Sequence, residues 1–372
     1  MPLLLTVIGT RPQYIKYAAL SPALRNVCDE FLVDSGQHYD DGLSGNFLSE
    51  LHIPRPHVTL DAPRHDSIPQ LSSMIDGIAE VIRSVKPHAT LCFGDTNSTL
   101  AAALASLKCG VEIIHVEAGE RAFTLDEVKV PPHSIPEEGN RVIVDHVSSL
   151  LLCASERGFS NLISESVTGA IYFTGDILYD LFLRNRPAID KRFSLLEEMR
   201  LEPGEYYYCT IHRAVNTDSR ERLESIVEAF ELLDRTVVFP VHPRTERLLM
   251  EYGILDRLAR SESIRILPPS GYIDSLVLSR FARKVITDSG GVMREAFFNG
   301  VRSVCVDDST AWIELCTSGW SELSGPGTAA IIQATHRETA GERPNFFGDG
   351  SAVERSVEAI RKFLFDRSGN DE

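Results

Sequence analysis

Short apolar runs alternate with amphipathic stretches along most of this chain, a pattern that predicts parallel β-strands separated by helices. In the first half the apolar runs lie at residues 3–8, 30–34, 89–93, 112–116, 149–153 and 171–173. In the second half they lie at residues 206–210, 236–240, 264–267, 284–287 and 303–306. Such runs, joined by helical segments, are typical of βαβ units. Two sets of similar size predict an α/β fold of two Rossmann-like, doubly wound domains facing a central cleft.

The stretches between these runs have the spacing of helices. They are predicted at residues 14–24, 67–85 and 98–108 in the first half, and at 220–233, 245–252 and 273–280 in the second. At 372 residues the chain is longer than a typical single core. We therefore expect an N-terminal domain at residues 1–177, a C-terminal domain at 178–350, and a closing helix with a polar tail at 351–372.

Composition excludes several classes of protein. The formal charge of −16, from 37 basic and 53 acidic residues, argues against a nucleic-acid partner. Seven cysteines without a Cys-x-x-Cys pair indicate free thiols in a reducing compartment. The apolar N-terminus lacks a basic start and a cleavage site, so it predicts a first strand, and no apolar run is long enough to span a membrane. These features predict a cytoplasmic protein.

The most informative motif is Asp288-Ser289-Gly290-Gly291, which follows an apolar run and precedes a helical stretch. A strand that turns into a helix through Ser-Gly-Gly leaves backbone N–H groups unpaired, glycines let phosphates come close, and the helix dipole favours negative charge. Glu295 lies about one turn into the helix, within reach of a ribose hydroxyl. The motif predicts a phosphate site, with an ordinary strand-to-helix turn as the alternative.

Polar residues also follow two apolar runs of the first half. Arg11 stands at a strand end beside a helix start, which suits a guanidinium that grips a diphosphate, and Lys16 falls one turn further on. An ordinary surface arginine is the alternative. Asp95, which follows the run at 89–93, can serve as an acid, a base or a ligand of sugar hydroxyls, or can cap a helix.

Carboxylates end the next segment of the first half. Glu117 ends a strand predicted to be buried, where a carboxylate is costly unless it is paired or functional, so we favour a functional role. Glu137 and Glu138 precede Arg141 at the start of a predicted helix. Taken alone, this second pattern is better explained by an acidic first turn with an ion pair three or four residues on.

Two strand ends of the second half carry histidine and arginine. His212 and Arg213 follow the run at 206–210, and His242 precedes Arg244 after the run at 236–240. Both residue types suit phosphates and sugar hydroxyls, and histidine can carry a proton near neutral pH. The chain lacks metal-binding spacings, a P-loop and a Gly-x-Gly-x-x-Gly motif, so we expect no metal and no nicotinamide cofactor. A sugar nucleotide fits these residues best.

At these positions the chain resembles the non-hydrolysing UDP-N-acetylglucosamine 2-epimerase family. The similar segments run in order from residue 9 to about 325. They include Gly9-Thr10-Arg11-Pro12, Gly36-Gln37-His38, Gly94-Asp95-Thr96-Asn97-Ser98, His115-Val116-Glu117-Ala118-Gly119, Pro136-Glu137-Glu138, His212-Arg213, His242-Pro243-Arg244, Gly271-Tyr272 and Asp288-Ser289-Gly290-Gly291. The segments 36–40 and 312–320 are most similar to the branch that acts on N-acetylated or diacetamido uronic-acid UDP-sugars.

The resemblance implies two Rossmann-like domains in the glycosyltransferase B-type arrangement, a homodimer, and a UDP-sugar substrate without a cofactor. The implied reaction inverts carbon 2 of a UDP-N-acetylated sugar by eliminating UDP and adding it back through a glycal. Catalysis would fall to Asp95, Glu117, Glu137 and His212, with Lys16 and Arg141 orienting them. Ser289, Gly290 and Gly291 would bind the diphosphate, Glu295 the ribose and the Gly271-Tyr272 loop the uracil, with Arg11, Arg213 and His242 around the phosphates.

The chain also departs from the family pattern near these residues. Arg294 interrupts the usual acidic or glutamine-rich pattern after Ser-Gly-Gly, and Asp307 stands where an arginine is expected. Extra residues at 124–134 separate the two predicted catalytic glutamates. An exchanged charge beside a substrate alters selectivity rather than fold, so the identity of the sugar stays open.

Three alternatives to the epimerase prediction remain. A hydrolysing variant would release UDP and a free manno sugar. A B-type glycosyltransferase would need an acceptor, and a UDP-sugar-binding protein would keep the scaffold without the reaction. Fold alone does not separate them. Whether a UDP-sugar changes in the absence of an acceptor does.

Overall fold

The computed structural model describes residues 1–37, 48–63, 67–338 and 341–366, and the chain divides into two compact units. Unit 1 comprises Met1–Arg121, Val130–Leu183 and Asn345–Glu372, and unit 2 comprises Ala122–Lys129 and Arg184–Pro344. The sequence predicted a single change of domain at residue 177, whereas the chain also enters unit 2 for eight residues after Arg121. His38, Tyr39, Asp40 and the predicted polar tail Ser368–Glu372 lie outside the described residues.

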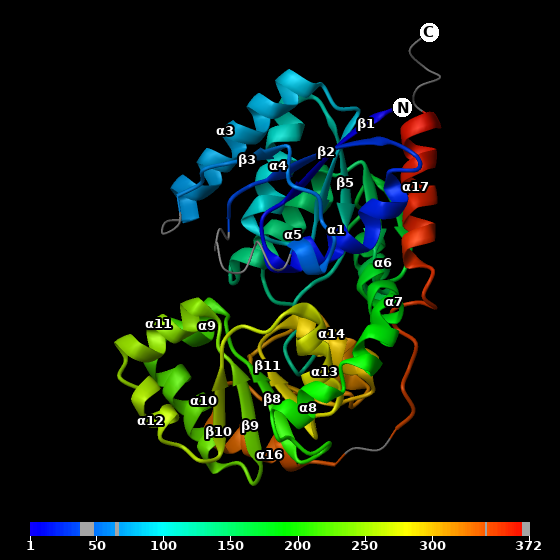
Figure 1. The fold of residues 1–372 in the computed structure, drawn as a ribbon. Coiled ribbons are helices and arrows are strands. Elements are labelled where there is room, and N and C mark those ends of the chain that lie inside the picture. Colours follow the sequence, from blue (N-terminus) through cyan, green and yellow to red (C-terminus); the bar gives the residue numbers. More distant parts are fainter. Residues whose placement is uncertain (38–47, 64–66, 339–340, 367–372) are drawn as a thin grey trace. The chain divides into compact units, whose positions relative to one another are not determined.

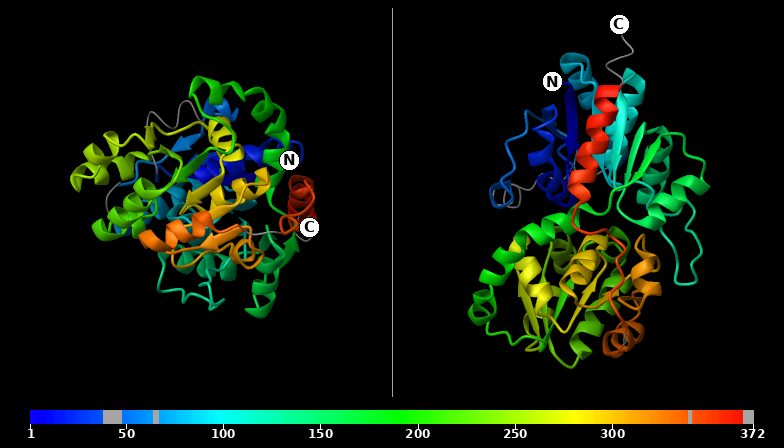
Figure 2. Two further views of the ribbon diagram at one scale, coloured as in Figure 1. Left: turned by 90° about the horizontal axis from the view of Figure 1, so that it is seen from below. Right: turned by 90° about the vertical axis from the view of Figure 1, so that its right-hand side faces the viewer.

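Unit 1 is built on a parallel sheet whose described strands have the order β3-β2-β1-β4-β5-β6-β7 (Figure 1). The strands are β1 (Leu3–Ile8), β2 (Asp29–Asp34), β3 (Val58–Thr59), β4 (Ala89–Phe93), β5 (Glu112–Val116), β6 (Leu150–Cys153) and β7 (Ala170–Phe173). The helices are α1 (Arg11–Leu24), α3 (Ser67–Val85), α4 (Asn97–Cys109), α5 (Pro136–Val147), α6 (Glu156–Ser164) and α17 (Ala352–Asp366), while α7 (Ile177–Lys191) begins in unit 1 and ends in unit 2. Helix α17 packs against α1, while α3, α4 and α5 pack side by side (Figure 2).

The sequence explains why these elements form. Strand β1 is almost wholly buried, as expected for a parallel sheet with both faces covered by helices. Helix α3 places Met74, Ile78 and Ile82 on one buried face because residues four apart share a side of a helix. Helix α4 ends at Gly110, whose φ of 70° is the left-handed conformation that stops a helix and favours glycine.

Unit 2 is built on a parallel sheet whose described strands have the order β10-β9-β8-β11-β12-β13. The strands are β8 (Tyr206–Thr210), β9 (Thr236–Pro240), β10 (Ile264–Leu267), β11 (Lys284–Thr287), β12 (Ser303–Cys305) and β13 (Ser321–Leu323). The helices are α8 (Ser194–Glu198), α9 (Ala214–Thr217), α10 (Arg220–Leu232), α11 (Pro243–Glu251), α12 (Leu255–Ala259), α13 (Tyr272–Arg280), α14 (Gly290–Asn299), α15 (Ile313–Thr317) and α16 (Thr328–His336).

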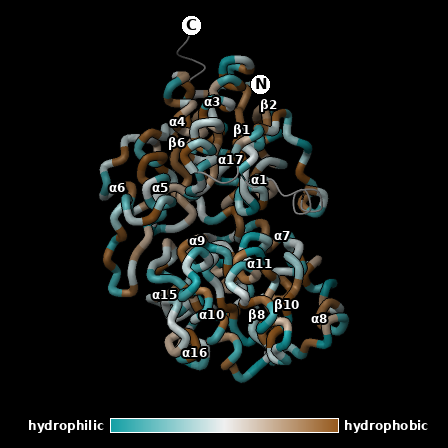
Figure 3. Tube along the Cα trace, turned by 90° about the vertical axis from the view of Figure 1, so that its left-hand side faces the viewer, coloured by the Kyte–Doolittle hydropathy of each residue, from teal (hydrophilic) through white to brown (hydrophobic). Residues whose placement is uncertain are grey.

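Buried apolar side chains form the core of each unit. Figure 3 shows the hydropathy of each residue along the trace. In unit 2 the rings of Phe230 and Phe239 pack edge to face, with their centroids 5.5 Å apart. Tyr206 and Tyr208 are also buried, and their hydroxyls bond Leu278 O at 2.7 Å and Ser275 Oγ at 2.8 Å. These bonds satisfy the polar ends of the two side chains, which makes their burial tolerable.

The predicted α/β fold of two doubly wound parallel sheets is confirmed. The sequence missed β3 and β13, which contain only two and three residues and lie at sheet edges. Runs this short carry no readable periodicity. No helix in the described part of the chain is long and apolar enough to cross a membrane.

Candidate active site

Each sheet reverses its strand order once, and polar residues gather at both reversals. In unit 1 the reversal places β1 beside β4, and in unit 2 it places β8 beside β11. Ligands of open α/β sheets bind at such points, outside the carboxyl ends of the strands, because the flanking loops diverge there. The loops after β1 and β4 carry Arg11 and Asp95, and those after β8 and β11 carry His212 and Ser289.

Glu117 and Lys16 form a shielded ion pair in unit 1. Lys16 Nζ lies 2.7 Å from Glu117 Oε1, and the two side chains are only 5% and 12% exposed. A Cβ placed on Gly94 would lie 3.0 Å from Lys16 Nζ and 3.7 Å from Glu117 Oε1, so the glycine borders both groups. Glu117 itself has a φ of 67°, a left-handed conformation that is costly for a residue with a side chain and clusters at functional sites.

Asp95 is held by the start of α5. Arg141 donates one bond to Asp95 Oδ2 and another, of 2.8 Å, to Glu138 Oε2, and Asn140 Nδ2 donates to the Asp95 carbonyl at 2.9 Å. Burial opposes the charge on Arg141, but the charges of Asp95 and Glu138 outweigh it and raise the pKa of Arg141. The ion pair expected within the helix is therefore made by Glu138, and the same arginine also orients Asp95.

Glu137 differs from its neighbour Glu138. Glu138 is fully buried against Arg141, whereas Glu137 is half-buried. Among the residues that the structure describes, the Glu137 carboxylate has no hydrogen-bond or ion-pair partner. The described residues therefore do not hold this carboxylate in an ion pair, which suits a group that exchanges protons with a substrate.

A buried network supports the loops that carry Asp95 and Glu117. His115 bonds Asp145 through Nδ1 and the Gly94 carbonyl through Nε2, both at 2.7 Å. Asp145 also accepts from the Gly119 N–H at 3.1 Å and from Arg121 at 2.7 Å. Burial by itself would raise the pKa of Asp145, but His115 and Arg121 hold it below its usual value. The network gives His115 a structural role, and its central residue, Asp145, was not among the residues predicted from the sequence.

Arg11 opens α1 at the carboxyl end of β1 and is half-buried. The adjoining turn is fixed by Gln13, whose Oε1 accepts from the Thr10 N–H at 3.2 Å. Gln13 Nε2 also donates to the Phe93 carbonyl, the last residue of β4, at 3.0 Å. The two loops at the reversal of this sheet are thereby tied together.

Asp288 organises the corresponding edge of unit 2. This carboxylate, 2% exposed at the end of β11, accepts backbone N–H groups of His212 at 3.1 Å and of Arg213 at 2.9 Å. Asn216 Nδ2 donates to it at 3.2 Å. His212 Nδ1 lies 3.4 Å from Asp288 Oδ1, so the imidazole is oriented by the same group. The sequence placed Asp288 in its motif without giving it this role.

Arg213 and His242, which were predicted around the phosphates, already have hydrogen-bond or ion-pair partners in unit 2. Arg213 pairs with Asp307, the residue that stands where an arginine was expected. Burial raises the pKa of Asp307, and the charge of Arg213 counteracts this effect only in part. His242 caps α11 by accepting the Arg244 N–H at 3.2 Å, with its ring centroid 6.2 Å from that of His212. A phosphate contact by Arg213 stays a prediction that requires a change of partner.

The Ser-Gly-Gly turn forms the predicted start of a helix. Ser289 Oγ accepts the Val292 N–H at 3.4 Å and caps α14. A Cβ on Gly290 would lie 2.7 Å from Trp312 Nε1, whereas one on Gly291 would find its nearest neighbour, Ser289 Oγ, at 3.7 Å. The packing of the Trp312 indole therefore explains why residue 290 is a glycine. A Cβ at residue 291 would meet only an ordinary van der Waals contact. The contact of both glycines with phosphates stays a prediction.

Two predicted nucleotide contacts lie deeper than expected. Tyr272 is the first residue of α13 and is 1% exposed, so its ring belongs to the core of unit 2. The uracil contact of the Gly271-Tyr272 loop stays a prediction. Glu295 is 7% exposed within α14, and its ribose contact stays a prediction.

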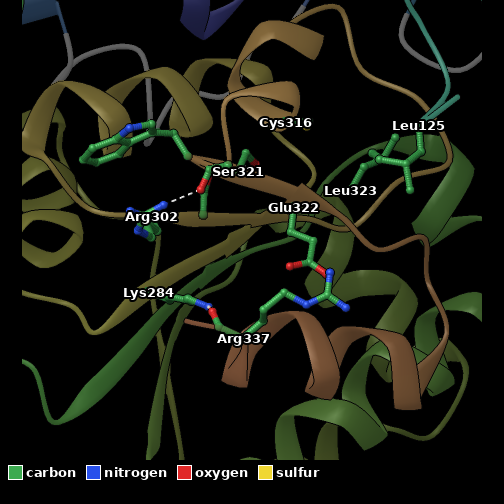
Figure 4. Close-up of a pocket in the computed structure, with 11 residues that line it drawn as sticks. Leu125, Lys284, Arg302, Cys316, Ser321, Glu322, Leu323 and Arg337 are labelled. Atoms are coloured by element: carbon green, nitrogen blue, oxygen red, sulfur yellow. Dashed lines mark hydrogen bonds and ion pairs between the residues drawn. The ribbon is translucent and has the colours of Figure 1, made fainter. Parts of the chain in front are cut away.

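A cavity of about 190 Å³ lies at the other end of the unit 2 sheet (Figure 4). Lys284, Ser303 and Ser321 line it and are the first residues of β11, β12 and β13, so it is remote from the strand ends that carry the polar motifs. Its cations are engaged: Lys284 donates to two carbonyls and Arg337 pairs with Glu322 at 2.8 Å. Among the described residues, no group of three or more side chains is placed to hold a metal ion.

Comparison with known proteins decides the family. The family model described as UDP-N-acetylglucosamine 2-epimerase matches residues 23–361. The chain belongs to this family. It is 36% identical over 361 residues to the UDP-N-acetylglucosamine 2-epimerase homolog of Methanococcus maripaludis, with 96% of this chain and 99% of that protein covered. It is 35% identical to the UDP-2,3-diacetamido-2,3-dideoxy-D-glucuronate 2-epimerase of Pseudomonas aeruginosa, with the same coverage.

A solved structure of the epimerase family agrees with the fold. The crystal structure of Methanocaldococcus jannaschii UDP-GlcNAc 2-epimerase in complex with UDP-GlcNAc and UDP aligns with a TM-score of 0.87 at 32% identity, covering 97% of this chain and 99% of that one. The family predicted from the motifs is thereby confirmed, as is the enzyme class, an isomerase.

The two glycines of α14 give a test of which one faces the ligand. We expect Gly290→Ala to lower both thermal stability and UDP affinity, because its methyl group collides with Trp312. Gly291→Ala should change stability by less than about 0.5 kcal/mol, since its methyl group meets only ordinary contacts, yet weaken UDP binding about tenfold. Thermal unfolding and calorimetric titration with UDP check both. Full UDP affinity in Gly291→Ala would exclude a close approach at this position.

Proposed function

We propose that this chain inverts carbon 2 of a UDP-N-acetylated sugar, converting UDP-N-acetylglucosamine or a related UDP-acetamido sugar into its manno epimer. Family membership and the UDP-GlcNAc bound in the Methanocaldococcus relative support the substrate class. The observation that carries the proposal is the pairing of Glu117 with Lys16 and of Asp95 with Arg141 at the reversal of one sheet.

The proposed reaction has two halves, an elimination of UDP and its re-addition. A base removes the proton from carbon 2, the bond from carbon 1 to the UDP oxygen breaks, and a carbon 1–carbon 2 double bond forms. UDP then bonds carbon 1 again while an acid delivers a proton to the opposite face of carbon 2. Each half needs a positioned acid or base, and such groups contribute about 10²–10⁴-fold in rate.

The carboxylates of unit 1 are suited to different parts of this task. Lys16 pairs with Glu117 and Arg141 pairs with Asp95, so a cation holds each of these carboxylates in position. Glu137, which is bound to no fixed cation among the described residues, is suited to giving up and regaining a proton. His212, oriented by Asp288 in unit 2, is the fourth candidate. We propose that these four residues divide the acid and base roles.

The departing UDP needs stabilisation of its developing charge. The N-terminus of α14 supplies backbone N–H groups and a favourable dipole, and we assign the diphosphate to Ser289, Gly290 and Gly291 there. We assign the ribose to Glu295 and further phosphate contacts to Arg11 and His242. The homodimer implied by the resemblance and the cytoplasmic location predicted from the composition stay predictions.

The charges near Arg213 bear on the choice of sugar. Asp307 neutralises Arg213, so this part of unit 2 offers less positive charge than an arginine at position 307 would give. A uronic-acid sugar carries a carboxylate that such a site attracts less strongly. We therefore propose an uncharged N-acetylated sugar, such as that of UDP-N-acetylglucosamine, ahead of a diacetamido uronic acid.

Incubation with UDP-N-acetylglucosamine and no acceptor tests this function. The expected result is a stable mixture of the gluco and manno epimers, both still attached to UDP, as resolved by anion-exchange chromatography. Release of UDP with free N-acetylmannosamine would show the hydrolysing variant instead. If neither UDP-N-acetylglucosamine nor the diacetamido uronic-acid substrate changes although UDP binds, the epimerase proposal is wrong.

A further inference from the structure

Residues 122–129, here called the strap, form a compact turn within unit 2. Phe123 and Lys129 pair as an antiparallel bridge that closes the turn. Inside it, the Thr124 N–H donates to the Val128 carbonyl at 3.0 Å, and the Val128 N–H donates back to Thr124 Oγ1 at 3.3 Å. The strap is thus a folded element at the start of the extra residues noted in the sequence.

Thr310 joins the strap to the start of α14. The Phe123 N–H donates to the Thr310 carbonyl at 2.9 Å, and the Thr310 N–H donates to the Phe123 carbonyl at 3.0 Å. Thr310 Oγ1 accepts the Trp312 N–H at 3.1 Å and contacts Met293 Sδ of α14 at 3.9 Å. One side chain therefore contacts both α14 and the segment that bears Trp312.

Trp312 in turn shapes the proposed diphosphate site. Its indole fills the space where Gly290 would carry a side chain. The guanidinium of Arg294 stacks on the same indole, 3.9 Å from the ring centroid, and Arg294 Nε donates to the Gly290 carbonyl at 3.4 Å. Any rearrangement of the Ser289–Gly291 turn must therefore move Trp312 or its contacts.

The polypeptide on the other side of the strap leads to the proposed catalytic carboxylates. Arg121, two residues before Phe123, is fully buried and bonds Asp145. Asp145 accepts the N–H of Gly119, two residues after Glu117. The strap of unit 2 therefore follows the Glu117 loop of unit 1 directly along the chain, and Gly119 and Arg121, which lie between them, are both bonded to Asp145 within unit 1.

We propose that Thr310 is a positioning residue that couples nucleotide binding at α14 to the placement of Glu117, with the strap as the connecting element. This inference rests on the proposed function, because it takes the N-terminus of α14 as the nucleotide site. A nucleotide that orders the Ser289–Gly291 turn also restricts the position of Trp312, which packs on Gly290. Trp312 is hydrogen-bonded to Thr310, so Thr310 and the strap bonded to it are restricted as well. The strap continues directly into the chain that leads back to Glu117. A demonstrated change at both ends is the evidence such coupling requires.

Amide hydrogen exchange of the full chain with and without UDP tests the coupling. In the unmodified protein, UDP should slow exchange at residues 290–292 and also at Phe123 and Thr310. Slower exchange at 290–292 with no change at Phe123 would overturn the coupling and leave the proposed function intact. No change at either place would show that α14 does not bind UDP, and both proposals would fail.

Matched variants at Thr310 sharpen the test. Thr310→Val keeps the side-chain shape but removes the acceptor for Trp312, whereas Thr310→Ser keeps the hydroxyl. We expect Thr310→Val to lose the UDP response at Phe123, to retain it at 290–292, and to lower kcat about fivefold, the effect of one hydrogen bond. Thr310→Ser and the exposed strap variant Val128→Ala should match the unmodified protein. A raised KM with unchanged kcat in Thr310→Val would show that Thr310 supports only the nucleotide site, and this result would overturn the coupling.

Discussion

Replacing Glu117 with glutamine should lower kcat about 10²–10⁴-fold and leave UDP affinity unchanged. The glutamine keeps the shape of the side chain but cannot take a proton from carbon 2. We propose Glu117 for this step because it pairs with Lys16 and has a left-handed backbone conformation, which clusters at functional sites. Initial rates of epimer formation and calorimetric titration with UDP measure the two quantities.

A control on the same strand separates this effect from general damage. Glu112 begins β5 and bonds Ser149, away from the strand end that carries Glu117. Glu112→Gln should retain kcat within about a factor of two, as expected for a substitution remote from the chemistry. If Glu117→Gln also retained kcat within that range, Glu117 would not be the base and the assignment would pass to Glu137 or Asp95.

Removing the carboxylate of Asp145 should lower the free energy of unfolding by about 3–5 kcal/mol. His115 and Arg121 are both fully buried and both bond this group, so Asp145→Ala leaves polar atoms without their partner inside unit 1. Urea unfolding followed by far-UV circular dichroism measures the loss. Asp256→Ala, at an exposed position of α12, should stay within about 0.5 kcal/mol of the unmodified protein. Equal losses in the two variants would contradict the role given to the network.

The same substitution should change the response to acid. Because the folded state holds the pKa of Asp145 below its usual value, its contribution to stability is present above about pH 4, the value for an unfolded aspartate. It is lost as the pH falls through the lower pKa of the folded state. The stability difference between the unmodified protein and Asp145→Ala should therefore shrink as the pH is lowered from 5 towards 2.

The strands and their carboxyl ends were predictable because a buried parallel strand is a local apolar run. Strands β1, β4, β5 and β8 begin and end where the sequence indicates, and Asp95, Glu117 and His212 accordingly follow the carboxyl ends of β4, β5 and β8. The position of a residue along a strand follows from its neighbours in sequence. It needs no knowledge of the tertiary contacts.

The partners of these residues were not predictable in the same way. Asp145 binds His115 across 30 positions, Asp288 binds His212 across 76, and Asp307 binds Arg213 across 94. Residues so far apart in sequence cannot be paired from the local spacing of apolar and polar residues. The entry of the strap into unit 2 and the packing of Trp312 on Gly290 depend likewise on tertiary structure. The sequence thus predicted which strand ends carry the polar motifs, and the structure added which groups hold those residues in position.

The proposed removal of a proton from carbon 2 is tested most directly by proton NMR of UDP-N-acetylglucosamine with the purified protein in deuterium oxide. The proposed mechanism predicts deuterium at carbon 2 of the UDP-linked manno epimer, and of the gluco form as the reaction reverses. Formation of the manno epimer with its original hydrogen still at carbon 2 would contradict elimination through a glycal.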